Sequence, residues 1–247
     1  MQDELAKVFS LPMCNIQNLT LIHTNIKPEF LQRVLHSFQA SKSFKQYSLI
    51  SSTNGKTTNS FTSFKSINFS RNSIEDKGLI SLGNLFKEFP ILCNLNTLIL
   101  SKCSITSKSL NYLFASTSVG KRLKFLDLSF NSLKEEPAEF YKYLSEPNQL
   151  SELNLSFTEL DVDKVINHFT RLIYKLIGYN CLYFKLFHTL YRGGCDENLE
   201  KLVLSGNHHH NTFSKISTDV LGKFIRSVKS LKHLDLSVAK LPGQIVQ

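Results

Sequence analysis

Leucines recur along this chain in a fixed frame. Two neighbouring stretches show the frame most clearly: residues 123–133 read LKFLDLSFNSL, and residues 150–160 read LSELNLSFTEL. Both match L-x-x-L-x-L-x-x-(N/T)-x-L, which is the signature of a leucine-rich repeat. Leu126 and Leu128 lie two residues apart, so a short strand would direct both side chains to one face. One such strand cannot bury its leucines alone, and stacked copies must therefore cover each other.

The same frame occurs seven times along the chain. Its copies begin at Ile16, Phe64, Leu95, Leu123, Leu150, Leu199 and Leu231. The successive steps are 48, 31, 28, 27, 49 and 32 residues. A step of about 28 residues leaves room for a full helix between one strand and the next.

Apolar stripes at helical spacing supply the helices. They predict helices over residues 77–89, 107–115 and 217–228. Pro28 and Pro137 lie near expected helix starts, where the missing N–H of proline does no harm. Strand followed by helix, repeated, gives an α/β leucine-rich repeat solenoid, a horseshoe of the ribonuclease-inhibitor kind. We expect parallel strands on its concave face and helices on its convex face.

Two steps, of 48 and 49 residues, exceed the usual 28. The first surplus lies in residues 41–60, which are rich in Ser, Thr, Asn and Lys and contain the turn dipeptide Asn54-Gly55. A polar surface loop inserted in the repeats is predicted there. Residues 1–247 as a whole are predicted to form a single leucine-rich repeat domain. The last copy ends at Leu241, too close to Gln247 for its own helix, so we expect a piece of a longer protein.

The second surplus, residues 172–192, is an anomalous hydrophobic insertion crowded with aromatic side chains. Its length approaches that of a membrane span, but Lys175, Lys185 and His188 interrupt it and repeats flank it on both sides. A hydrophobic hairpin or helix packed on the solenoid is a second interpretation. We favour a third, that these residues are absent from the mature protein, because their removal restores a step of 28 residues.

Strand residues that point away from the leucines should form the concave face, where solenoids usually bind partners. The candidate partner-binding residues are Thr97, Ile99, Phe125, Asp127, Glu152, Asn154, Lys201, Val203, His233 and Asp235. Phe125 beside Asp127 has the character of an interface anchor, unless a neighbouring side chain covers the ring. A serine follows each of six strands, at Ser70, Ser101, Ser129, Ser156, Ser205 and Ser237. These hydroxyls should bond the turn, and a nucleophilic role is not expected.

Charge and cysteine content narrow the setting. The chain has 29 Lys and Arg against 20 Asp and Glu, a formal net charge of +9. Scattered basic residues are most simply solvated helix faces, and a surface for acidic lipid or acidic protein is the sharper alternative. No interleaving of arginine with aromatics is present, so no nucleic-acid partner is predicted. Five cysteines without paired ends favour a reduced, intracellular setting.

The clusters that could carry chemistry have simpler structural explanations. Three adjacent histidines, residues 208–210, cannot all converge on one ion, so we expect a polar turn there and no metal site. Asp161 and Asp163 stand at an expected helix start, where capping accounts for them better than catalysis. The sequence contains no phosphate-binding loop, nucleophile elbow or HExxH motif. We therefore expect no catalytic residue, no metal and no cofactor.

Two longer stretches resemble a known family. Residues 67–90, INFSRNSIEDKGLISLGNLFKEFP, and residues 143–165, YLSEPNQLSELNLSFTELDVDKV, resemble the CARMIL family, the linkers of actin capping protein, the Arp complex and myosin-I. The alternation in the turn slot is also similar, at Thr24, Asn72, Asn131 and Thr158. The resemblance runs from residue 16 to residue 241 and skips residues 41–60 and 172–192, where the step length also fails.

The resemblance implies a non-enzymatic protein-interaction scaffold, the repeat part of a regulator of actin filament capping and assembly at the plasma membrane. It implies a cytoplasmic, cytoskeletal and membrane-associated location, with partners from the actin-regulatory machinery. It also implies a homodimer formed through segments outside this chain and peripheral membrane association of the full-length protein. Two alternatives share the solenoid: a repeat-type activator of a small GTPase and a ribonuclease-inhibitor-like binding module.

Overall fold

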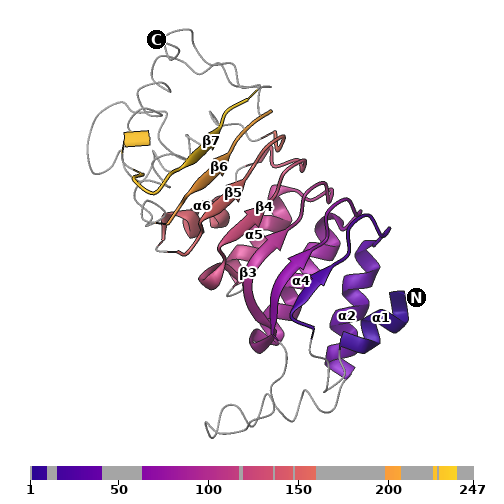
Figure 1. Cartoon of the computed structure of the whole chain (residues 1–247). Helices are drawn as coiled ribbons and strands as arrows, with labels where there is room; N and C mark the ends of the chain where they lie inside the picture. Colours follow the sequence, from indigo (N-terminus) through magenta and orange to yellow (C-terminus); the bar gives the residue numbers. More distant parts are fainter. Residues whose placement is uncertain are drawn as a thin grey trace, which may run out of the picture.

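In the computed structural model, the described part of the chain forms one sheet that is covered on one face by a layer of helices (Figure 1). The structure describes residues 2–9, 16–40, 63–116, 119–135, 137–146, 148–159, 198–206, 225–226 and 228–237. Each unit runs from a strand through a tight turn and, where the chain is described, into a helix that packs on the back of the sheet. The predicted α/β leucine-rich repeat solenoid is confirmed.

Seven short parallel strands pair in the order in which the chain makes them. They are β1 (Asn18–Thr20), β2 (Phe64–Asn68), β3 (Cys93–Ile99), β4 (Phe125–Asp127), β5 (Glu152–Asn154), β6 (Lys201–Val203) and β7 (His233–Asp235). The central apolar residue of each strand pairs with that of the next, in the row Leu19, Ile67, Leu98, Leu126, Leu153, Leu202 and Leu234. The seven copies of the frame therefore share one register, as the sequence predicts.

Five α-helices and two short 3-10 turns lie in the described part of the chain. They are α1 (Gln2–Phe9), α2 (Pro28–Ala40), α4 (Glu75–Glu88), η1 (Pro90–Leu92), α5 (Ser107–Ser116), η2 (Val119–Arg122) and α6 (Ala138–Ser145). Helices α4 and α5 confirm the predictions for residues 77–89 and 107–115. Pro28 begins α2 and Pro137 immediately precedes α6, as expected for proline at a helix start. The helix predicted over residues 217–228 lies almost entirely outside the described residues.

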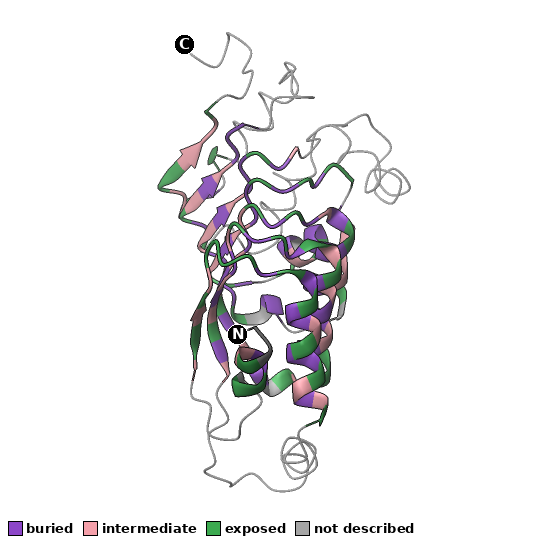
Figure 2. Cartoon of the chain, turned by 90° about the vertical axis from the view of Figure 1, so that its right-hand side faces the viewer, coloured by how far each residue is buried: buried purple, intermediate pink, exposed green. Residues whose placement is uncertain are grey.

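The leucines of the frame fill the space between the two layers. Leu98 and Leu126 are completely buried, as are Leu128 and Leu133 where the chain turns toward the helices. Burying one such side chain stabilises the fold by about 2 kcal/mol. In Figure 2 the strands stand on one side and the helices on the other, with exposed residues on the outer surfaces of both. Each repeat thus supplies half of a core that its neighbours complete.

Helix α1 has no counterpart in the repeat pattern, and the leucine frame does not predict it. It packs against α2, and Ala6 on its inner side is only 1% exposed. Its contribution is therefore to cover the outer side of the first repeat helix.

The asparagine of the frame holds the turn that follows the strand. Asn131 donates through Nδ2 to the carbonyls of Leu100 and Leu128, at 2.7 and 2.9 Å. Its Oδ1 accepts from the backbone N–H groups of Cys103 and Ile105, at 3.0 and 3.2 Å. The side chain is buried, and its amide joins the backbones of two repeats.

Asparagine alternates with smaller residues because one amide serves two consecutive turns. Asn72 accepts from the backbone N–H of Thr24 at 2.9 Å. This bond corresponds to the one from Cys103 to Asn131, two repeats earlier in the chain. The residue after the threonine or cysteine slot takes a left-handed conformation, at Asn25, Ser104 and Glu159, with φ of 55°, 58° and 55°. The two kinds of turn therefore differ in backbone shape as well as in side chain.

Cys103 occupies the turn position that asparagine fills in the repeats on either side, and it is fully buried. Its thiol donates to the carbonyl of Phe69, with an S···O distance of 3.2 Å. Burial raises the pKa of this thiol to about 12. The group stays protonated at neutral pH and serves as a small structural donor, so it has none of the features of a reactive cysteine.

Both long steps of the sequence are single steps of the sheet. Strand β1 pairs directly with β2, and β5 pairs directly with β6, in the same register as the other pairs. The predicted insertions, residues 41–60 and 172–192, both lie outside the described residues. Among the helices that the structure describes, none has the length and apolar character needed to cross a membrane.

Candidate protein-binding surface

All ten candidate residues lie on the face of the sheet opposite the helices, and the strand register sorts them into two columns. The first column, at the start of the short strands, contains Thr97, Phe125, Glu152, Lys201 and His233. The second column, two residues later, contains Ile99, Asp127, Asn154, Val203 and Asp235. None of the ten side chains is buried, so each can contribute to an outer surface.

The polar members of the second column hold the following turn. Asp127 accepts through Oδ1 from the backbone N–H of Ser129 at 2.9 Å and from its hydroxyl at 2.6 Å. Asn154 accepts from Ser156 in the same two ways, at 3.1 and 2.8 Å. The serines therefore bond the turn as expected. Their acceptor is the side chain two residues earlier, which makes this column partly structural.

One serine shows how the second column controls this pattern. Ile99 offers no acceptor to the serine that follows it, and the hydroxyl of Ser101 instead lies 2.8 Å from that of Ser129.

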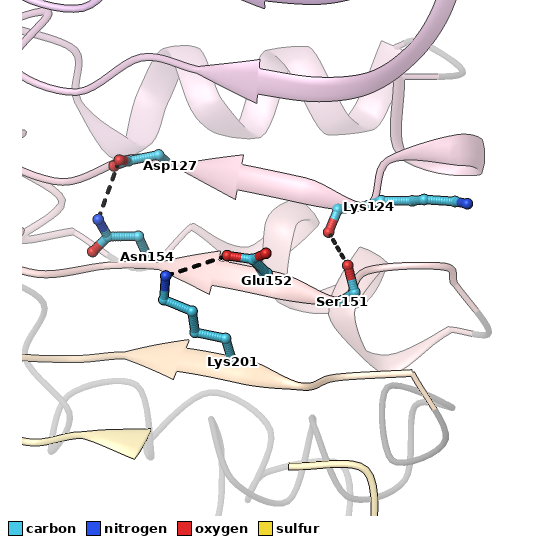
Figure 3. A network of polar contacts seen from close by, with 6 residues as sticks. All are labelled: Lys124, Asp127, Ser151, Glu152, Asn154 and Lys201. Carbon is cyan, nitrogen blue, oxygen red and sulfur yellow. Dashed lines mark hydrogen bonds and ion pairs between the residues drawn. The ribbon is translucent and has the colours of Figure 1, made fainter. Parts of the chain in front are cut away.

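At the β7 end of the second column, hydrogen bonds from Ser237 lower the pKa of Asp235, so this carboxylate is anionic at neutral pH. Asn154 also donates to Asp127 across the strands, at 3.1 Å (Figure 3). These side chains hold one another in place along the edge of the face.

The first column offers the more accessible chemistry. Phe125 is half-buried, which leaves part of its ring on the surface and part against its neighbours. Beside it, Lys201 Nζ lies 3.4 Å from Glu152 Oε2, and both side chains are more than a third exposed (Figure 3). His233 is exposed at the far end. An aromatic anchor followed by an ion pair is a surface suited to another protein.

The register extends the face beyond the ten candidates. Strands β1 and β2 add Asn18 and Ser66 to the first column and Thr20 and Asn68 to the second. The candidate set began at β3 and missed them, although the same frame marks their positions in the sequence. Asn68 also binds the following serine, since its Oδ1 accepts from the Ser70 hydroxyl at 2.6 Å.

Metal chemistry finds no support among the residues that the structure describes, where no group of three His, Cys, Asp or Glu side chains could hold an ion. The histidines at residues 208–210 lie outside those residues, as do Asp161 and Asp163. The structural explanations given for them remain predictions.

Comparison with known proteins agrees with the repeat architecture. The Leucine Rich Repeat family model matches residues 122–143, which span β4 and most of α6. The chain is 27% identical over 235 residues to the mouse protein named "Capping protein, Arp2/3 and myosin-I linker protein 3", and 28% identical to the human protein of that name. Each similarity covers 92% of this chain and 14% of the relative, so the chain spans about a seventh of those proteins.

A differently named relative is similar over about half of the chain. The mouse protein "NACHT, LRR and PYD domains-containing protein 4E" is 29% identical over 132 residues, which is 53% of this chain and 11% of that protein. Repeats of this kind present a surface for other proteins, and the chain is a repeat-containing interaction scaffold. The shared frame, the family match and the similarity along 92% of the chain confirm the resemblance seen in the sequence: the chain is a leucine-rich repeat region similar to part of the capping protein, Arp2/3 and myosin-I linkers.

Proposed function

We propose that this chain is the partner-binding repeat region of a non-enzymatic regulator of actin filament capping and assembly at the plasma membrane. The observation that supports this most is the similarity along 92% of the chain to relatives whose name links capping protein, Arp2/3 and myosin-I. The similarity covers nearly all of the repeats, beyond one isolated motif. The proposed setting is the cytoplasm, at the actin cytoskeleton beneath the membrane.

The proposed contact surface is the first column of the concave face. Phe125 supplies apolar area near the middle of the sheet, and the exposed pair of Glu152 and Lys201 supplies orientation. Exposed ion pairs of this type contribute little to folding, about 0–1 kcal/mol, so a partner can exchange them for its own charges. The second column is the less suitable part, because its polar side chains are engaged by the turn serines.

In the full-length protein, we propose that segments outside this chain form a homodimer and bring the repeats to the membrane surface. The net charge of +9 favours approach to an anionic surface, though the repeats alone would bind it weakly. The role of the repeats in this arrangement is to present the concave face to a partner.

Direct binding of the full chain to purified capping protein, Arp2/3 complex and myosin-I tests the proposal. Binding to at least one of the three is expected by interferometry at protein concentrations up to about 50 µM. Phe125→Ala and Lys201→Glu should each weaken that binding by about tenfold or more, because both change the first column. Lys87→Glu makes the same charge reversal on the exposed side of α4 and should leave binding unchanged.

Absence of binding to all three proteins by the folded chain would refute the proposed partners. Equal weakening by Lys87→Glu and Lys201→Glu would refute the concave face as the contact surface, since only overall charge would then matter. Circular dichroism of each variant confirms that the fold is kept.

A further inference from the structure

A second exposed row runs along the edge of the sheet, one residue beyond the serine position. This row, the turn ridge, consists of His23, Arg71, Lys102, Phe130 and Phe157. All five residues are exposed and have a left-handed backbone, with φ between 51° and 59°. Each backbone N–H donates to a carbonyl of the next repeat, at 2.8 to 3.0 Å. The ridge therefore repeats at the spacing of the strands, about 4.8 Å.

The two phenylalanines of the ridge are poorly explained by folding alone. Phe130 is 53% exposed and Phe157 is 40% exposed, and their rings stack with centroids 4.7 Å apart and planes 9° apart. A left-handed backbone disfavours a bulky residue, whereas Gly206 takes the next place in the row at φ 73° without that cost. An exposed aromatic pair on an unfavourable backbone indicates a surface that binds a ligand or a partner.

The apolar step formed by these rings is flat and well supported. The ring of Phe157 lies over Gly206, where an added Cβ would come within 2.3 Å of the ring. The backbone of Gly206 is itself held by a bond from its N–H to the carbonyl of Ser237, at 2.9 Å. Phe157 is thus fixed on one side by glycine and on the other by Phe130, so a ligand would meet a preformed surface.

The other half of the ridge is cationic. Arg71 and Lys102 occupy the two places before Phe130, and within the described part of the chain neither forms an ion pair. Two carboxylates of neighbouring turns are already engaged: Asp127 by its hydrogen bonds to the turn, and Glu159 by an ion pair of 3.2 Å with Lys134. The ridge therefore runs from two available cations to an aromatic pair.

We propose that the turn ridge binds an acidic, extended segment of a partner protein that carries one large apolar side chain. The apolar side chain would pack on Phe130 and Phe157, and the acidic residues would face Lys102 and Arg71. Three strand spacings separate Arg71 from Phe157, about 14 Å, which four to five extended residues span. Charge complementarity to Arg71 and Lys102 favours an acidic segment. The two phenylalanine rings favour a segment that also carries an apolar side chain, which a simple polyanion lacks. The turn ridge is separate from the two columns of the concave face, so the test of one surface does not depend on the result for the other.

Fluorescence anisotropy with the full chain tests this proposal. The probe is a labelled peptide Gly-Phe-Leu-Glu-Asp-Glu-Glu, for which a dissociation constant of about 50 µM is expected at about 50 mM salt. The double variant Phe130→Gly with Phe157→Gly should weaken binding by about tenfold or more. Glycine adopts the left-handed backbone without strain, so the double variant should stay folded, with the loss of the two exposed rings as its only cost in stability. Arg71→Glu with Lys102→Glu should also weaken binding, whereas Lys87→Glu should not.

Several outcomes would overturn the proposal. They are failure of the natural chain to bind the peptide saturably, unchanged affinity in the glycine variant, and equal affinity for the same peptide with alanine in place of phenylalanine. Binding of the chain to vesicles containing phosphatidylserine, lost in the same variants while the peptide does not bind, would assign the ridge to lipid and reject a protein segment.

Discussion

Residue 131 shows how one side chain can hold two repeats. The amide of Asn131 satisfies two backbone N–H groups of the preceding turn and carbonyls on both sides, all away from water. Asn131→Ala would leave these groups buried without partners, and each such group costs about 1–3 kcal/mol. We expect a loss of about 3 kcal/mol in the free energy of unfolding, measured by urea denaturation followed by circular dichroism.

The control for this change is Asn96→Ala. Asn96 lies in β3 on an exposed position, so the same substitution removes the same atoms without orphaning a turn. We expect a loss below about 0.5 kcal/mol. Similar losses in the two variants would show that the buried amide contributes no more than an exposed one.

Among the helices, α4 stabilises the start of α5. Asp76 accepts from the Thr106 hydroxyl at 2.7 Å, from the Thr106 N–H at 2.8 Å and from the Ser109 hydroxyl at 2.6 Å. Partial burial would raise the pKa of this carboxyl, but the bonds from Ser109 and Thr106 outweigh burial and lower it. A carboxylate at a helix N-terminus is also favoured by the helix dipole. One repeat thus caps the helix of the next.

This cap predicts an acid-sensitive contribution to stability. The folded-state pKa of Asp76 lies below its unfolded value. The stabilisation is therefore fully present above about pH 5 and is lost as the pH falls through the unfolded and then the folded pKa of this carboxyl. Asp76→Asn should cost about 1 kcal/mol at neutral pH, and the gap to the natural chain should shrink as the pH falls below about 4. Urea unfolding at several pH values measures it, with exposed Glu75→Gln as the control. A gap that stays constant with pH would contradict the assignment to the carboxylate.

The elements differ in how far the sequence could predict them. The register of β1 to β7 followed from the frame, since leucines that must be buried together fix which residues pair. Helices α4 and α5 followed from their apolar stripes. Helix α1 has no repeat pattern, and the cap by Asp76 joins residues 30 positions apart, so neither was visible in local spacing. The two columns followed from strand alternation, but the left-handed backbone that exposes Phe130 depends on turn geometry and leaves no hydrophobic period.

Within the described residues, the molecule is a stack in which each repeat makes its main contacts with its neighbours. Sheet pairing runs from one described strand to the next, from β1 to β7, and the described helices pack mainly on the helix before and the helix after, from α1 to α6. Central strands are therefore covered on two sides and terminal strands on one. The burial of the leucine row reflects this, because Leu126 is fully buried whereas Leu19 and Leu234 are only half-buried.

Position in the stack should therefore decide the cost of one and the same substitution. Leu126→Ala opens a cavity between β3, β5 and the helix layer and should cost about 3 kcal/mol, within the range for buried leucines. Leu19→Ala removes the same atoms from the half-buried edge strand and should cost about 1 kcal/mol. Urea denaturation measures both values, and hydrogen exchange locates them: protection should fall on both sides of β4 in the first variant, and in β1 and β2 alone in the second. Equal costs, or a loss of protection spread evenly over the sheet in both variants, would mean that the molecule unfolds as a single globular core and that nearest-neighbour stacking does not govern its stability.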